Sequence, residues 1–213
     1  MKFCNLSVLF LVGAIALFAA GFPAPATDLP APANQHSATA VLAGGCFWGM
    51  EAVFERLDGV HDVVAGYAGG SASTAQYETV GTGRTGHAES IRITYDPARV
   101  SYGKLLQVYF AVAHDPTELN RQGPDEGTQY RSAIFYSSDA QKNVAEAYIQ
   151  QLDQAKIFRH RIVTQVVPLP GFYRAEGYHQ HYLQLHPDNP YIVYNDLPKL
   201  KNLEREFPEL LKH

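Results

Sequence analysis

The order of strand-like and helix-like patterns between residues 39 and 136 restricts the chain to few folds. An apolar run after residue 38 predicts a buried strand, and apolar residues at helical spacing follow it. A second helix, capped by Ser101, precedes the last strand. The four strands are expected over residues 39–43, 60–68, 91–95 and 132–136. This β-α-β-β-α-β order predicts an α+β fold, a two-layer α/β sandwich with ferredoxin-like connectivity.

The rest of the chain is predicted to extend this core as a C-terminal extension rather than to add a second domain. Ser138 and Gln141 have the spacing of a capping box, which predicts the start of another helix. Residues 39–213 are therefore interpreted as a single catalytic domain. Further expectations are a strand over 162–167, helices over 176–185 and 199–211, and loops over 71–87 and 114–129.

The N-terminus has the composition of a secretory signal peptide. Lys2 precedes an apolar run over residues 6–20, and small residues and prolines follow. As a helix this run would be about 22 Å long, shorter than the roughly 30 Å of a membrane core. We therefore expect a cleaved signal over residues 1–26, with cleavage near Ala20 or an uncleaved anchor as the alternatives. An Ala/Pro-rich linker should cover residues 27–38, and the mature protein should be periplasmic or secreted, with no stable membrane insertion.

Composition limits the partners and the redox chemistry. The 213 residues include 17 Lys and Arg against 21 Asp and Glu, without a basic run, which argues against nucleic acid as a partner. Signal cleavage would remove Cys4 and leave Cys46 as the one cysteine, so no internal disulfide could form. Because an unpaired thiol is a liability in an exported protein, we expect Cys46 to have a function. We also expect a monomer.

Cys46 lies where the first strand turns into the first helix. Backbone N–H groups at a helix N-terminus lack partners and the helix dipole is positive there, which should stabilise a thiolate and lower the pKa of the thiol. Gly44 and Gly45 allow a sharp bend, and Phe47 and Trp48 could wall an apolar pocket. The alternative is an inert core cysteine, since free cysteines are usually buried.

Alternation along the third strand places a carboxyl group on an apolar face. Counting by twos, Glu89 shares a face with Ile91 and Ile93. Desolvation there would raise the pKa of Glu89 and make it a general acid near neutral pH. The alternative is that the strand begins at Ser90 and that Glu89 is a solvated loop residue.

Three loop residues complete the candidate site. Tyr77 and Tyr130 could donate O–H groups to an anionic or dipolar oxygen. Asp125 lies in the same loop as Tyr130. Because the chain has 13 tyrosines and solvated loop aspartates are common, none of these three residues is informative alone.

Two histidines offer a different chemistry for Cys46. His87 or His114 could be the base of a Cys–His thiol hydrolase of the extracytoplasmic space. A third hypothesis is a non-catalytic extracytoplasmic binding domain, in which Cys46 would be dispensable. The hydrolase depends on a histidine beside the thiol, whereas the binding domain needs neither group.

Two further patterns are interpreted as misleading. His179 and His181, with His186 nearby, could suggest a metal site, but no Cys or paired His completes a ligand set. We expect these histidines to cover a helix surface. Residues 81–86 fit GxGxxG, but a strand rather than a helix is expected after them, which argues against a nucleotide site.

Seven short motifs together resemble the A-type peptide methionine sulfoxide reductases. They occur in the family's order between about residues 41 and 185. They are Gly-Gly-Cys-Phe-Trp-Gly at 44–49, Gly-Tyr-Ala-Gly-Gly at 66–70, Gly-His-Ala-Glu at 86–89, Tyr-Asp-Pro at 95–97, His-Asp-Pro at 114–116, Arg-Gln-Gly at 121–123 and Asp-Glu-Gly-Thr-Gln-Tyr-Arg-Ser at 125–132. The first and last are highly specific.

The resemblance implies one site in which every candidate residue has a role. By this resemblance Cys46 would be the nucleophile and Glu89 the proton donor to the sulfoxide oxygen. Tyr77 and Tyr130 would hold that oxygen. Phe47 and Trp48 would receive the S-methyl group, and Asp125 would contact the bound substrate. The family acts on the S-epimer of methionine sulfoxide, free or in proteins, and has a mixed α/β two-layer fold. An exported member would repair oxidised exported proteins, without a metal.

The chain departs from the family pattern in one respect. Most members carry a resolving cysteine, often in the C-terminal tail, which attacks the sulfenic acid left on the nucleophile and passes a disulfide to thioredoxin. Residues 202–213 contain no cysteine. The resemblance therefore implies no bound cofactor and an external thiol reductant, thioredoxin-like or small, for a Cys46 sulfenic acid.

Overall fold

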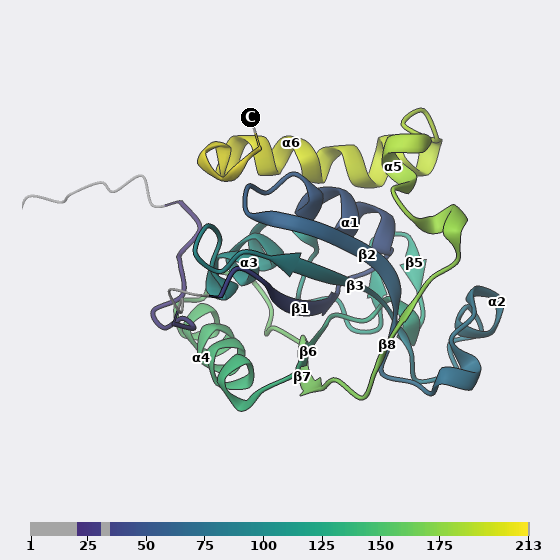
Figure 1. Cartoon of the computed structure of the whole chain (residues 1–213), viewed down its shortest axis with the longest axis horizontal. Coiled ribbons are helices and arrows are strands. Elements are labelled where there is room, and N and C mark those ends of the chain that lie inside the picture. The colour runs from purple at the N-terminus through teal and green to yellow at the C-terminus, as the bar shows by residue number, and fades with distance from the viewer. Residues whose placement is uncertain (1–20, 31–34, 213) are drawn as a thin grey trace, which may run out of the picture.

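A curled six-stranded sheet with packed helices forms the centre of the molecule (Figure 1). The structure is a computed structural model that describes residues 21–30 and 35–212. The strands stand in the order β7-β6-β1-β3-β2-β8. Their bounds are β1 Ala38–Ala43, β2 Val60–Ala68, β3 Ala88–Tyr95, β6 Ala133–Tyr136, β7 Gln165–Pro168 and β8 Phe172–Arg174.

The four central strands confirm the predicted ferredoxin-like connectivity. Strands β1, β2, β3 and β6 follow the β-α-β-β-α-β order with helices α1 (Phe47–Glu55) and α3 (Tyr102–Val108). Neighbours in the group β6-β1-β3-β2 are antiparallel. The later part of the chain adds β7 parallel to β6 and β8 antiparallel to β2, so it supplies both edges of the sheet.

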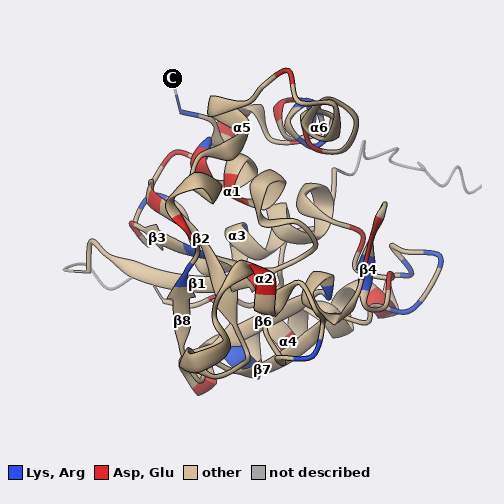
Figure 2. Cartoon of the chain, turned by 90° about the vertical axis from the view of Figure 1, so that its right-hand side faces the viewer, with Lys and Arg blue, Asp and Glu red and all other residues tan. Residues whose placement is uncertain are grey.

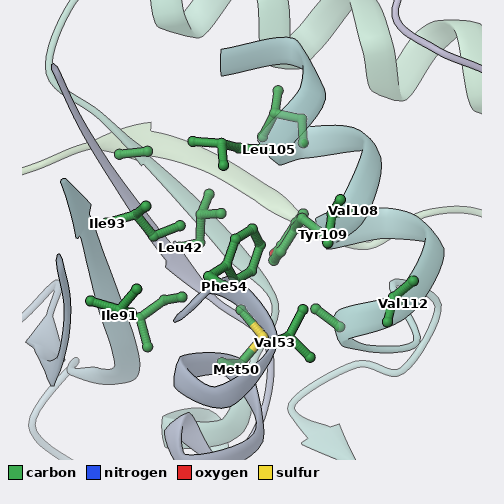
Figure 3. Close-up of a cluster of buried hydrophobic side chains, with 14 of the residues drawn as sticks. Leu42, Met50, Val53, Phe54, Ile91, Ile93, Leu105, Val108, Tyr109 and Val112 are labelled. Carbon is green, nitrogen blue, oxygen red and sulfur yellow. The ribbon is translucent and has the colours of Figure 1, made fainter. Parts of the chain in front are cut away.

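Alternation along β1 divides the interior into two clusters. Ala40 and Leu42 belong to the main core with the helices, whereas Val41 and Ala43 belong to a smaller cluster on the other face. Phe172 packs on that smaller cluster. Figure 3 shows the main core, where side chains of the strands, α1 and α3 meet, among them Leu42, Ile91, Ile93, Met50, Val53, Phe54, Leu105 and Val108.

Two predicted helix starts are confirmed, one of them only in part. Ser101 caps α3 by accepting from Lys104 N at 3.1 Å, and Ser138 caps α4 (Asp139–Gln154) by accepting from Gln141 N at 3.2 Å. The reciprocal half of the capping box is wrong. The side chain of Gln141 accepts from Ser137 N at 2.8 Å instead, and it donates to Thr39 O in β1 at 2.8 Å.

The helix predicted over residues 176–185 is wrong. Two short turns, Gly177–His179 and α5 (Tyr182–Leu185), take its place. The side chain of Gln180 bonds Ala65 N and O at 3.1 and 3.0 Å, which ties the chain to β2 and interrupts the helix. Farther on, a wide turn, Ile192–Asp196, leads into α6 (Leu197–Glu206), which lies along α1 (Figure 1). Helix α6 ends earlier than predicted, before Pro208, which cannot continue it.

The two predicted loops contain short elements. They are the turn Ala72–Thr74, α2 (Tyr77–Val80), the hairpin of β4 (Arg121–Gln122) with β5 (Asp125–Glu126), and the turn Thr128–Tyr130. Thr128 Oγ1 donates to Gly83 O at 2.7 Å, which joins the two loops. The strand expected after residues 81–86 is confirmed, because β3 follows that segment.

Residues 21–30 pack against the domain although they form no helix or strand. Tyr148 in α4 donates its hydroxyl to Pro23 O at 2.5 Å. Asp28 accepts from Gly103 N at 2.7 Å, in the first turn of α3. The segment is therefore fixed at both its ends by long-range hydrogen bonds.

This packing bears on the predicted signal peptide and linker. The signal was predicted over residues 1–26, of which 1–20 lie outside the described residues. Residues 21–26 are packed on the domain, and so is Asp28 in the predicted linker, 27–38. Within the described ranges, no helix combines the length and apolar character needed to cross a membrane. Acidic and basic positions are interspersed along the described chain (Figure 2).

Candidate active site

A cavity of about 200 Å³ lies at the N-terminus of α1. It is lined by Cys46, Phe47, Trp48, Tyr77, Glu89, Asp125, Tyr130 and Tyr191. All seven residues predicted from the sequence thus meet in one place, and Tyr191 is an addition that sequence reasoning missed. A larger cavity of about 510 Å³, near residues 21–23 and α6, is lined by no cysteine or histidine.

Cys46 immediately precedes α1 and is 9 % exposed. The turn requires glycine at position 45, where φ is 89° and a Cβ would lie 2.5 Å from Gln122 Cγ. The predicted fall in the thiol pKa is wrong. Burial raises the pKa of Cys46 well above its ordinary value and the charge of Glu89 raises it further, which outweighs the backbone N–H of Trp48. The structure therefore holds Cys46 as a thiol.

Glu89 is 3 % exposed, and its Oε2 accepts from Phe47 N at 3.2 Å. The alternative that Glu89 is a solvated loop residue is wrong, because β3 begins at Ala88. Burial raises the pKa of Glu89 to about 8, although the hydrogen bond from Phe47 opposes the shift. The carboxyl group therefore carries a proton at neutral pH, as predicted, beside the helix end that carries the thiol.

Tyr77 and Tyr130 reach the cavity from two separate loops. The backbone N–H of Tyr77 donates to Glu176 Oε1 at 2.9 Å, which fixes the start of α2. Burial raises the pKa of both phenols, and the charge of Glu89 adds to the shift. Both residues therefore keep their O–H groups as donors.

Trp48 is held by aromatic residues of the C-terminal extension. Its ring stacks on Tyr182 with centroids 3.7 Å apart and planes at 7°, and Tyr191 meets it edge-on at 5.8 Å. The Tyr191 hydroxyl donates to Asp125 Oδ2, and burial raises the pKa of Asp125. These contacts make an apolar wall with one polar end. The sequence carries no local signal for Tyr182 or Tyr191, because only the folded chain brings them to Trp48.

The prediction that the histidines near residue 180 cover a helix surface is wrong for His179. Its side chain is buried, with ring centroids 5.0 Å from Phe47 and 4.5 Å from Tyr77. Its Nδ1 accepts from Trp48 Nε1 at 3.2 Å, and burial lowers its pKa, so the ring is neutral. His179 therefore supports the aromatic wall from behind.

Neither candidate base of a thiol hydrolase lines the cavity. The ring of His87 lies 3.2 Å from Gly70 N and 3.0 Å from Ser71 O. The ring of His114 bonds Ser132 Oγ at 2.7 Å, and burial lowers its pKa to about 3. A general base must reach the thiol, directly or through one water. The geometry therefore gives the Cys–His hypothesis no support.

One group among the described residues has the spacing of metal ligands: Glu51, Glu55 and His181. It does not line the cavity. Its members already bond one another, because His181 N donates to Glu51 Oε2 at 2.7 Å and His181 Nδ1 lies 2.5 Å from Glu55 Oε1. These hydrogen bonds connect α1 to the segment that carries His179, which explains why the three residues lie together.

Comparison with known proteins gives consistent matches. A family model described as peptide methionine sulfoxide reductase matches residues 38–211. Peptide methionine sulfoxide reductase MsrA 2 of Mesorhizobium japonicum is 61 % identical over 82 % of this chain and 89 % of its own length. MsrA 2 of Synechocystis is 50 % identical over 93 % of this chain and 94 % of its own length.

Solved structures agree in fold. Reduced Mxr1 from Saccharomyces cerevisiae is 34 % identical, covers 75 % of this chain and 91 % of its own, and has a TM-score of 0.64. Methionine sulfoxide reductase A of Corynebacterium diphtheriae is 35 % identical, covers 74 % of this chain and 78 % of its own, and has a TM-score of 0.60.

The family match includes every residue that lines the cavity. Enzymes of this family use no prosthetic cofactor and take electrons from a thiol reductant. The chain belongs to the A-type peptide methionine sulfoxide reductases, which are thiol-dependent peptide-methionine (S)-S-oxide reductases.

Proposed function

We propose that this chain performs methionine sulfoxide reduction at Cys46, through a sulfenic acid. The observation that carries this assignment is that one small cavity joins the thiol, the protonated Glu89 and two phenols. The substrate is the S-epimer, either as the free amino acid or within an oxidised protein.

Two protons and two electrons convert a sulfoxide to a thioether and water. The sulfur of Cys46 supplies the electrons by attacking the sulfoxide sulfur, and an S–S bond forms while the sulfoxide oxygen takes a proton from Glu89. The proton of the thiol completes the water molecule that leaves. Attack of a water on the Cys46 sulfur then breaks the S–S bond, releases methionine and leaves a sulfenic acid, with one proton returned to Glu89.

Charge develops on the substrate oxygen during this attack. Glu89, Tyr77 and Tyr130 all carry protons at neutral pH and all line the cavity. Donors that are already in place stabilise a growing negative charge more than they stabilise the bound sulfoxide, and this difference lowers the barrier. The three groups are therefore assigned to that oxygen.

The aromatic wall is assigned to the S-methyl group. Phe47 and Trp48 face the cavity, and Trp48 is fixed by its stacking on Tyr182 and its bond to His179. An apolar methyl group gains by leaving water for such a wall. Asp125, bonded to Tyr191, is assigned to a polar part of the substrate near the cavity mouth.

Regeneration is assigned to an external thiol, because Cys46 is the one cysteine after residue 20. A thiol of the reductant attacks the sulfenic acid: its sulfur bonds the Cys46 sulfur, its proton joins the departing hydroxyl to make water, and a mixed disulfide forms. A second thiolate then attacks the reductant's sulfur and releases Cys46. A thioredoxin-like protein or a small thiol can supply both groups.

A protein that begins at Gly21 should release about one methionine per enzyme from the S-epimer when no reductant is present, because the sulfenic acid consumes the only thiol. Methionine is quantified after mixing with each epimer, and a sulfenic-acid trapping reagent should label Cys46. Small thiols should restore turnover. A burst of two methionines would reveal a second redox group, and a preference for the R-epimer would contradict the proposed substrate.

We further propose that the chain is exported, acts as a monomer and repairs oxidised exported proteins. Support for export comes from Lys2 and the apolar run over residues 6–20. We place signal cleavage just before Gly21 rather than after Ala26, because the later site would remove the bond between Pro23 and Tyr148.

The mature N-terminus is the measurement that tests this proposal. Mass spectrometry of the protein from the extracytoplasmic fraction of producing cells should find a chain that begins within a residue or two of Gly21, and gel filtration should give the mass of one chain. A full-length chain retained in the cytoplasm would contradict export. A chain that begins at Thr27 would contradict the proposed cleavage site.

A further inference from the structure

An ion pair from the C-terminal extension lies against the first turn of α1. Lys199 Nζ donates to Asp196 Oδ1 at 3.1 Å. A Cβ built on Gly49 would lie 2.0 Å from Asp196 Oδ1 and 2.9 Å from Lys199 Nζ. The pair therefore touches the backbone of α1 three residues after Cys46, where α6 packs along α1 (Figure 1). Only glycine at position 49 leaves room for it.

The pair is buried, and one oxygen of its carboxylate is left without a partner among the described residues. Asp196 is 0 % exposed, and its Oδ2 has no hydrogen-bond partner among the described residues. The side chain of Lys199 is 18 % exposed. Buried ion pairs can often be replaced by apolar residues without loss of stability, and an orphaned carboxylate oxygen adds a further penalty. Such a pair beside a nucleophile points to an electrostatic role.

Most of the titratable groups around Cys46 are acids. The titratable and charged groups that line or adjoin the site are Glu89, Asp125, Asp196, Tyr77, Tyr130, Tyr191, His114, His179 and Lys199. The two histidines are neutral at pH 7, because burial lowers their pKa. Lys199 therefore supplies the positive charge of this group, and in a buried region its effect is only weakly screened.

We propose that the Asp196–Lys199 pair sets the reactivity of Cys46. Lys199 is the positioning residue whose positive charge favours the thiolate, and Asp196 fixes the ammonium group of Lys199 in place and partly offsets its charge. The direction of each effect agrees with the charges, because Lys199 lowers the pKa of Cys46 and Asp196 raises it. The inference rests on the proposed role of Cys46 and adds to it a regulator from outside the sequence motifs.

The two partners should shift Cys46 in opposite directions. In a chain that begins at Gly21, the rate of alkylation of Cys46 by iodoacetamide is measured against pH. Lys199→Met should raise the apparent pKa and slow alkylation at pH 8 several-fold, and Asp196→Asn should lower the apparent pKa and speed it. One pKa unit corresponds to about a tenfold change in thiolate. Lys199→Arg should restore most of the rate, and Lys201→Met, an exposed change on the same helix, should have no effect.

The proposal would be overturned if the apparent pKa of Cys46 moved in the same direction in Lys199→Met and Asp196→Asn, or in neither. A merely structural pair would change access to Cys46 in the same direction in both variants. If Asp196→Asn fails to fold, the Met and Arg variants of Lys199 still decide between charge and packing. Alkylation does not depend on turnover. Loss of the expected shifts in an enzyme that reduces the sulfoxide would therefore count against this inference alone, and shifts without any turnover would count against the proposed function alone.

Discussion

Cys46→Ser should abolish reduction of the S-epimer. A hydroxyl is a far weaker nucleophile toward sulfur than a thiolate, and its pKa cannot be brought near neutrality. Burial already raises the pKa of the thiol, and the same burial would oppose an alkoxide more strongly. Turnover is measured on a chain that begins at Gly21, with a small thiol as reductant and both epimers as substrates.

The serine variant should keep the fold, because the substitution removes little volume at the end of a turn fixed by Gly45. Its thermal unfolding should stay within a few degrees of the parent, and it should still bind the sulfoxide through the aromatic wall. Turnover of the S-epimer by this variant would show that another group is the nucleophile. Unchanged ligand binding with no turnover in either protein would favour the non-catalytic binding domain instead.

The position of Glu89 could be predicted from the sequence because strand parity is a local property. Side chains in a strand alternate, so the apolar residues Ile91 and Ile93 fix the face on which Glu89 lies. The strand order of the core could be predicted for a similar reason, since short connections between regular patterns allow few topologies.

The pKa of Cys46 could not be predicted in the same way. The helix N-terminus acts locally and lowers the pKa, whereas the two larger effects come from burial and from Glu89, which is far away in the sequence. A sequence pattern reports the effect of the helix N-terminus, but it says nothing of burial or of the charge of Glu89. The expectation for the pKa therefore had the wrong sign, although Cys46 does line the cavity.

The support for Trp48 was missed because it comes from a segment that has helical periodicity but forms no continuous helix. His179 and Tyr182 belong to short turns that exist because Gln180 bonds β2 and because Glu51 accepts from His181 N. Helical periodicity over residues 176–185 would have placed His179 on a surface. Tertiary hydrogen bonds overrode that local preference, and the result is a site whose wall depends on the C-terminal extension.

Glu89→Gln should lower kcat/KM for the S-epimer by roughly 10²–10⁴-fold, which is the usual contribution of a positioned general acid. Glutamine has nearly the same shape, and its amide oxygen can still accept from Phe47 N, which donates to Glu89 at 3.2 Å. The substitution therefore removes the transferable proton and leaves the geometry. Steady-state kinetics with a small thiol, run at saturating reductant, measure the effect.

The same substitution should raise stability at neutral pH. The pKa of Glu89 is about 8 in the folded chain and about 4.3 in an unfolded one, so folding favours the protonated form. The stability contributed by this protonation is fully present below about pH 4 and is lost progressively as the pH rises to about 8. Because Gln has no proton to lose, the Tm difference in favour of the variant should be largest near pH 8 and small near pH 4.

A more stable and much less active Glu89→Gln variant would separate loss of the acid from loss of the fold. His87→Ala supplies the matched comparison, because His87 is buried but does not line the cavity, so kcat/KM per folded molecule should change far less. The opposite pattern, an inactive His87→Ala and an active Glu89→Gln, would mean that a histidine rather than a carboxyl group moves the proton. The Cys–His hydrolase would then explain the site better than a sulfoxide reductase that uses Glu89 as its acid.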